Sequence, residues 1–290
     1  MSAQPLPRTP VGLVDGLSIE IYHACAGAVS NSGLSDFARS PAHYHALHLD
    51  PRRPVEEETP AQLVGQLAHC ALLEPAEFGK RYAVGPVGDK RLKAWKTWAE
   101  DYPQDEDGSF TLLTPAQAAA AWAMAESAKR NPDVAKLLGK GRPEVSAFWI
   151  DKATGLACRC RPDWVSPAGR GVILADVKTC GDASPAQFAR QVARMGYHRQ
   201  AAFYSDGYAE ASGLPVLGFV FIAIETAWPY LSSAVMLDDE SLAKGREEIA
   251  ALLPRFAACK ASNAWPGYSD AIELVSLPAW ALSTTTEGLQ

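Results

Sequence analysis

The feature that most constrains the fold of this chain is a change of pattern near Gly141. Beyond it lie three short segments rich in Val, Ile, Cys and aromatic residues, at 143–150, 156–165 and 171–178. Glycine-containing turns separate them. Segments of this length and composition, broken by turns, are typical of β-strands. We therefore expect three consecutive antiparallel strands.

The starts of helices are legible on either side of these strands. Thr59 and Thr114 each precede Pro, Ala and Gln, the order of a capping box with Pro at the first helical position, and Ser184 repeats the pattern. The first half of the chain is thus predicted to be mainly helical, with helices at about 33–48, 60–73, 90–101, 115–130 and 132–138.

After the three strands, both helices and strands are predicted. We expect a helix from Pro185 and a second helix at about 197–211. Two strands, at about 215–225 and 230–237, and a last helix at about 239–260 follow. Strands, then helices, then strands predict an α+β (mixed α/β) fold, a core sheet flanked by helices with a helical N-terminal region. We expect one compact domain, in which 1–140 form the helical N-terminal part, 141–265 the core and 266–290 a C-terminal tail.

Composition excludes few functions. The 290 residues are 48% hydrophobic and 21% charged, as in ordinary globular proteins, and a chain of this size supports a core without metals or disulfides. The net charge of −6 argues mildly against nonspecific coating of nucleic acid but is compatible with an enzyme acting on DNA. Without an apolar stretch near the roughly 18 residues of a membrane span, or a signal peptide, a cytoplasmic location without membrane contact is expected.

The six cysteines form no CxxC pair, so we expect neither a zinc ribbon nor an iron–sulfur cluster. Cys158 and Cys160 could be read as a metal pair. Alternate residues of a strand share a face, however, and free cysteine packs well in cores. We therefore favour reduced, buried thiols.

Two acidic residues and a lysine accompany consecutive predicted strands. Asp176 and Lys178 share a strand face, with Val177 directed into the core, and Asp163 lies near the end of the preceding strand. Phosphodiester hydrolysis needs such a set, because carboxylates hold Mg²⁺, which activates water, and a lysine can orient that water or stabilise the anionic transition state. A surface hairpin with ordinary charges is the alternative, but Pro162-Asp163 at this spacing favours a site.

Further motifs occur in one order along residues 19 to 260. They are Tyr22-His23, Ser30 to Leu34, Ser40 to Tyr44, Gly65 to His69, Glu144, Arg161-Pro162-Asp163, Asp176 to Thr179, and Gln200 to Tyr204. Together they resemble the PD-(D/E)XK nuclease superfamily, and within it the exodeoxyribonuclease VIII (RecE-type) nucleases of phages and prophages. The resemblance implies a restriction-endonuclease-like core, with Asp163 and Asp176 as metal ligands and Lys178 as the catalytic lysine.

The resemblance also implies roles for four other residues. His69 matches a helix-borne histidine that assists metal binding; alone it would more often be structural, but it shares a polar helix face with Gly65 and Gln66. Glu144 matches an acidic residue, a possible metal ligand, at the start of the first strand, where a solvent-facing residue is the alternative. Gln200 and Tyr204, four residues apart on one helix face, match a QxxxY element beside the catalytic lysine or the DNA; an ordinary helix surface is the alternative.

The function so implied is a Mg²⁺-dependent exonuclease acting on double-stranded DNA ends, with Mn²⁺ able to substitute. The resemblance favours 5′-to-3′ resection for a single-strand annealing protein, a homo-oligomer, and a phage or prophage origin. A restriction-like or Cas4-like endonuclease and an inactive DNA-end-binding module remain alternatives. The basic segment 90–98 could contact DNA through its Lys, Arg and Trp residues, but we prefer an amphipathic helix with its tryptophans in the core.

Overall fold

A mixed five-stranded sheet forms the centre of the computed structural model, which describes residues 10–25, 27–54, 57–88, 90–102 and 110–282. The strand order is β10-β9-β8-β7-β4. Strands β8 and β9 are parallel, and the other neighbours are antiparallel. The bounds are Arg142–Pro143 for β4, Trp164–Ala168 for β7, Gly171–Cys180 for β8, Val216–Glu225 for β9 and Ser232–Met236 for β10.

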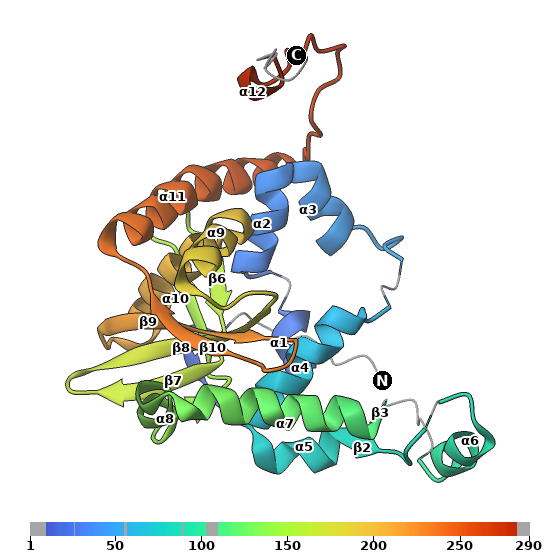
Figure 1. The fold of residues 1–290 in the computed structure, drawn as a ribbon. Coiled ribbons are helices and arrows are strands. Elements are labelled where there is room, and N and C mark those ends of the chain that lie inside the picture. The colour runs from blue at the N-terminus through green and yellow to red at the C-terminus, as the bar shows by residue number, and fades with distance from the viewer. Residues whose placement is uncertain (1–9, 26, 55–56, 89, 103–109, 283–290) are drawn as a thin grey trace, which may run out of the picture.

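Helices cover both faces of this sheet (Figure 1). On one face, α4 (Pro60–Leu73), α7 (Pro115–Arg130) and α8 (Pro132–Leu138) pack in one apolar cluster with alternate strand residues such as Ala175 and Ile222. On the other, α2 (Asn31–Arg39), α9 (Pro185–Met195), α10 (Tyr197–Ser212) and α11 (Asp239–Ser262) pack with Leu174 and Phe221. Helices on both sides of a mixed sheet confirm the predicted α+β architecture.

Two smaller sheets complete the strands. Antiparallel β1 (Gly12–Val14), β5 (Ser146–Ile150) and β6 (Ala157–Cys160) form one, and parallel β2 (Tyr82–Val84) and β3 (Thr111–Leu113) form the other. The remaining helices are α1 (Ile19–Ala24), α3 (Pro41–His48), α5 (Pro75–Arg81), α6 (Lys93–Glu100) and α12 (Ala279–Leu282). Among the described helices, none combines the length and apolar character that crossing a bilayer requires.

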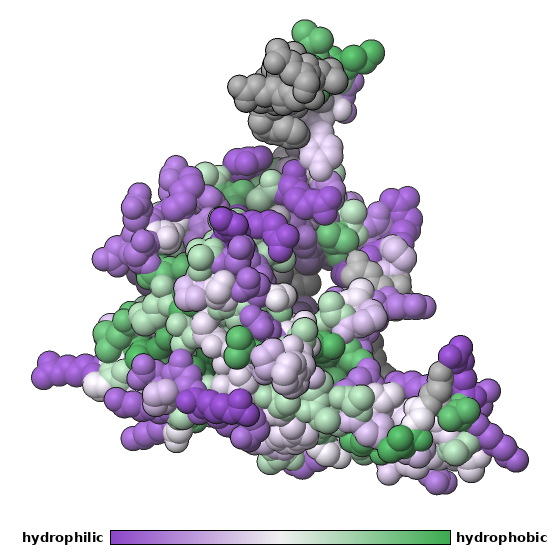
Figure 2. Space-filling view, in the orientation of Figure 1, coloured by the Kyte–Doolittle hydropathy of each residue, from purple (hydrophilic) through white to green (hydrophobic). Residues whose placement is uncertain are grey.

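Two ends of the molecule project from the body. Helix α6 lies at a corner beyond β2 and β3, and the C-terminal segment with α12 leaves the body beside α3 and α11 (Figure 1). Polar side chains cover much of the face in Figure 2, whereas apolar side chains gather on the C-terminal segment, where Ile272, Leu274 and Val275 are exposed.

The three predicted segments pair antiparallel with their neighbours in the chain, as expected, but they do not form three continuous strands of one sheet. Segment 143–150 divides into β4 and β5 at Glu144, whose φ of 57° places the backbone in the left-handed region. Segment 156–165 divides into β6 and β7, because Pro162 has no N–H to give to a strand ladder. As a result, β5 and β6 pair in the small sheet, while β7 and β8 form a hairpin in the large one.

The helix predicted at 33–48 is two helices. Ser40 is extended, with φ −168° and ψ 155°, and its hydroxyl accepts a hydrogen bond from the His43 N–H that caps α3. The helix predicted at 90–101 is shorter. In it Lys93 and Lys96 are exposed and Trp95 is buried, as preferred from the sequence, but Trp98 is only half-buried. Capping boxes begin α4 and α7 as predicted, but at the start of α9 the Ser184 side chain makes no capping hydrogen bond. Cys158 and Cys160 are free and buried, which confirms their interpretation.

Candidate active site

The site begins where β8 extends beyond the end of its neighbour β7. The first residue of β7, Trp164, pairs with Ala175, so from Asp176 onward the β7 side of β8 is open. There the N–H of Val177 donates to Oδ2 of Asp163 at 2.8 Å, in place of a strand partner. Asp163 therefore stands just before β7, not at the end of the preceding strand as predicted. This position brings its carboxylate alongside Asp176.

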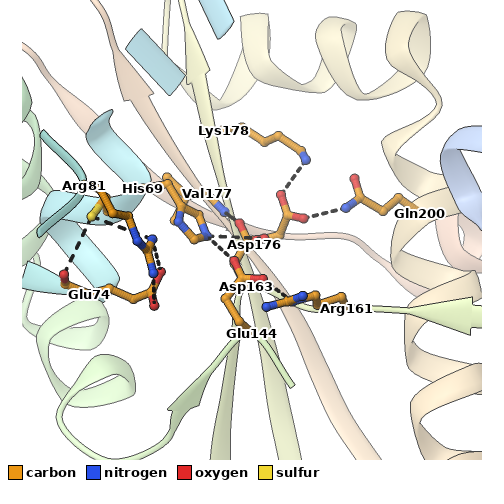
Figure 3. A network of polar contacts seen from close by, with 11 residues as sticks. His69, Glu74, Arg81, Glu144, Arg161, Asp163, Asp176, Val177, Lys178 and Gln200 are labelled. Atoms are coloured by element: carbon orange, nitrogen blue, oxygen red, sulfur yellow. Dashed lines mark hydrogen bonds and ion pairs between the residues drawn. The ribbon is translucent and has the colours of Figure 1, made fainter. Parts of the chain in front are cut away.

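Asp176 and Lys178 share one face of β8, as the strand period predicted. Asp176 is buried, and its Oδ2 lies 2.5 Å from Nζ of Lys178. Its other oxygen accepts a hydrogen bond of 2.5 Å from Nε2 of Gln200, on α10 (Figure 3). Val177 packs toward the cluster that contains α4. The structure thus brings Gln200 to the buried carboxylate.

His69 and Glu144 approach Asp163 from two other elements (Figure 3). Helix α4 packs on the sheet through residues such as Leu67, which leaves His69 directed at the open edge of β8. Nε2 of His69 lies 3.0 Å from Oε1 of Glu144 and 3.6 Å from Oδ1 of Asp163. Glu144 stands between β4 and β5 rather than starting a strand, and its N–H donates to the carbonyl of Asp163.

These side chains surround a cavity of about 1170 Å³. His69, Glu144, Asp163, Lys178 and Tyr204 line it, together with Gly65 and Gln66 of the predicted polar face of α4. Asp176 and Gln200 do not line it; they lie in the buried layer next to Lys178. All seven predicted site residues therefore belong to one neighbourhood, of which five face the cavity.

The cavity is also lined by residues to which the sequence assigned no role. Arg159 and Arg161 line it, and their guanidinium groups lie 4.7 and 5.6 Å from the ring of Tyr22. A signal for them existed, because Arg159, Arg161 and Asp163 alternate along the chain as residues of one strand face do. Glu74, at the end of α4, gave no such signal; it lines the cavity and receives two hydrogen bonds from Arg81.

Comparison with known families agrees with this geometry. Residues 30–278 match the model of a family described as a PDDEXK-like domain of unknown function (DUF3799). The chain belongs to this family. The predicted membership of the PD-(D/E)XK superfamily and the predicted fold are thereby confirmed.

Among solved structures, the chain resembles a candidate exonuclease from Eubacterium rectale, with a TM-score of 0.61 and 16% identity over 93% of this chain and 98% of that one. At this identity the likeness establishes the fold. An alkaline exonuclease from Laribacter hongkongensis matches at a TM-score of 0.25 and 14% identity, over 69% of this chain and 97% of that one, which carries no weight. Among curated proteins, none matches the chain.

In this PDDEXK-like site the charged groups shift one another's pKa. Burial, and then the charge of Asp163, raise the pKa of Asp176 to about 6. Although burial alone would act the other way, His69 holds the pKa of Asp163 below its usual value. Likewise, despite burial, Asp176 and Asp163 raise the pKa of Lys178, which keeps it an ammonium group. The site therefore holds a fixed cation beside a carboxylate that titrates near pH 6.

The donor atoms fit a divalent cation. The pKa of His69 is raised well above its usual value by Asp163 and Glu144, although burial opposes this. The proton on its imidazole thus stands between two carboxylates, where a metal ion would also be attracted. Within the described residues, ligand atoms of His69, Glu74 and Glu144 lie within 4.8 Å of one another. Carboxylates with one imidazole suit Mg²⁺ or Mn²⁺.

Proposed function

We propose that this protein is a divalent-metal-dependent exonuclease that hydrolyses phosphodiester bonds at double-stranded DNA ends. The observation that carries the proposal is the convergence of His69, Glu144 and Asp163 on one cavity, beside the pair of Asp176 and Lys178. Gathering like-charged carboxylates in a partly buried place disfavours folding, and such clusters with perturbed pKa values are typical of functional sites.

Each residue would have a distinct task. His69, Glu144, Asp163 and Asp176 would hold Mg²⁺, or Mn²⁺ in its place; when bound, such an ion polarises a phosphate and lowers the pKa of a bound water. The ammonium group of Lys178 would stabilise negative charge that develops on the phosphate. Gln200 would fix the orientation of Asp176. Tyr204, whose pKa burial raises well above its usual value, remains a phenol that can donate a hydrogen bond.

The finer features of this proposal come from the motifs shared with RecE-type nucleases. They support 5′-to-3′ degradation that leaves a 3′ single strand for an annealing protein of phage-type recombination. They also support a homo-oligomer encoded by a phage or prophage and acting in the cytoplasm of its bacterial host.

The test compares a linear duplex with a closed circle, each incubated with the protein and Mg²⁺ or with EDTA. We expect loss of the linear duplex alone, and only with Mg²⁺. Cutting of both would instead indicate a restriction-like or Cas4-like endonuclease, and binding without cutting would indicate an end-binding module. Linear duplexes labelled at the 5′ or the 3′ end report the direction, since 5′-to-3′ degradation releases the 5′ label first.

Replacement of Lys178 tests the site itself. Lys178→Ala should lower the cleavage rate by about 10²- to 10⁴-fold, because it removes the cation next to Asp176, while the circular dichroism spectrum stays unchanged. Lys152→Ala is the matched control, since Lys152 is an exposed lysine paired with Glu210, and should cleave at the wild-type rate. Wild-type activity of Lys178→Ala would exclude the proposed site.

A further inference from the structure

Arg161 holds the side of Glu144 that faces away from His69. Its Nε lies 2.5 Å from Oε2 of Glu144, while Oε1 of the same carboxylate lies 3.0 Å from Nε2 of His69 (Figure 3). The two oxygens of Glu144 are therefore divided between an arginine and the group of candidate metal ligands.

The backbone does not favour the position of Glu144 by itself. Its φ of 57° lies in the left-handed region, which residues with a Cβ rarely adopt and which persists only where the surroundings enforce it. The N–H of Glu144 is tied to the carbonyl of Asp163, which holds the main chain. The side chain needs a partner of its own, and Arg161 supplies it.

The side chain of Arg161 is held in place near Glu144. It precedes Pro162, its guanidinium lies 5.6 Å from the ring of Tyr22, and its side chain is 12% exposed. Within the part of the chain that the structure describes, Glu144 is the one carboxylate that forms an ion pair with it. A guanidinium group is planar and rigid, so it orients a carboxylate more closely than an ammonium group does.

We propose that Arg161 is a positioning residue for the metal centre, which holds Glu144 by one oxygen so that the other stays directed at His69 and Asp163. This inference rests on the proposed function, in that it assigns Glu144 to the ion. Side chains that hold metal ligands in place tune metal affinity, and their loss typically weakens binding about 10- to 100-fold. Arg161 would therefore act through Glu144 and not by contact with the ion.

The test is a double-mutant cycle on the full chain, read out as Mn²⁺ affinity by calorimetry without DNA. Arg161→Gln should weaken Mn²⁺ binding about 10- to 100-fold in the wild-type background and by less than about threefold in Glu144→Gln, since the residue acts through that carboxylate. Arg142→Gln is the control; Arg142 is an exposed arginine two residues from Glu144, paired with Asp15, and its loss should leave Mn²⁺ affinity unchanged.

Arg161→Lys keeps the charge and carries the test if Arg161→Gln fails to fold. It should bind Mn²⁺ several-fold more weakly than wild type, and again only while Glu144 is present. Unchanged Mn²⁺ affinity in the Arg161 variants, or equal losses with and without Glu144, would overturn the positioning role. A wild-type protein that binds Mn²⁺ and shows this coupling but cleaves no DNA would leave the inference standing and refute the proposed function.

Discussion

Asp176 is the carboxylate of the site whose protonation changes near physiological pH. Burial and the charge of Asp163 raise its pKa to about 6, and the contacts with Lys178 and Gln200 oppose that rise. A metal ion binds the charged form, so binding must release any proton that Asp176 carries. The charged form dominates above about pH 6 and is lost as the pH falls through that value.

Because the raised pKa of His69 means that Mn²⁺ must displace a proton from that ligand too, Mn²⁺ affinity should fall with pH already above about 6. The fall should become steeper below about pH 6, where a second proton on Asp176 is also displaced, by up to about tenfold per pH unit for each proton. Gln200→Leu removes a hydrogen bond that favours the carboxylate, so it should move this acid limb to higher pH. Calorimetry across pH 4.5–8 measures both effects (about the range in which carboxyl groups and histidine titrate). Gln187→Leu, on the exposed side of α9, is the control and should leave the pH dependence of Mn²⁺ affinity unchanged. The same pH dependence in Gln200→Leu as in wild type would contradict the role given to Asp176.

At the scale of elements, the placement of α10 decides where Gln200 and Tyr204 point. The helix packs so closely on β5 that a Cβ added to Gly207 would overlap the ring of Trp149. On its other side, a Cβ on Gly245 of α11 would overlap the carbonyl of His198. These two glycines therefore allow α10, the helix that carries Gln200 to Asp176, to pack closely against both β5 and α11.

Gly207→Ala should lower stability by about 1–3 kcal/mol, because the new methyl group forces α10 or Trp149 to move. The melting temperature should fall by several degrees, and cleavage at temperatures well below it should also slow, since Gln200 moves with the helix. Gly79→Ala on α5 is the matched control. No atom lies within 4 Å of its added Cβ, and alanine favours a helix by about 1 kcal/mol relative to glycine, so this variant should not lower the melting temperature. A wild-type melting curve for Gly207→Ala would contradict the packing argument.

At the scale of the whole molecule, the site joins the two halves of the chain. His69 comes from α4, which packs on one face of the large sheet. Asp163 directly precedes β7, Asp176 lies on β8, and Gln200 comes from the opposite face. A ligand that needs all of these residues binds the folded chain and not the unfolded chain. Its binding energy therefore adds to the stability of the entire fold.

Mn²⁺ should raise the melting temperature, with a gain of about 2.7 kcal/mol at a concentration 100 times its dissociation constant. EDTA should reverse the gain. Asp163→Asn should remove most of it, because it deletes a charged ligand while an amide oxygen can still accept from Val177. Asp206→Asn, an exposed aspartate paired with Arg246, should keep it. An equal shift in Asp163→Asn and wild type would place the ion elsewhere.

Features that depend on near neighbours in the chain could be predicted from the amino-acid sequence. Thr59 and Thr114 predicted helix starts because a capping box closes within four residues. The period of a strand placed Asp176 and Lys178 on one face, and that of a helix placed Gln200 and Tyr204 together. The shared motifs then predicted that Asp163 and His69 belong to the same site.

The way in which these elements meet depends on contacts between residues far apart in the chain. The break at Pro162, which sends β6 and β7 into different sheets, depends on strand partners far apart in the chain. The left-handed backbone of Glu144 and its pair with Arg161 depend on the packing around that break. Periodicity and capping act over a few residues, whereas strand pairing and ion pairs act across space, so only the folded chain could show which carboxylate oxygen faces His69.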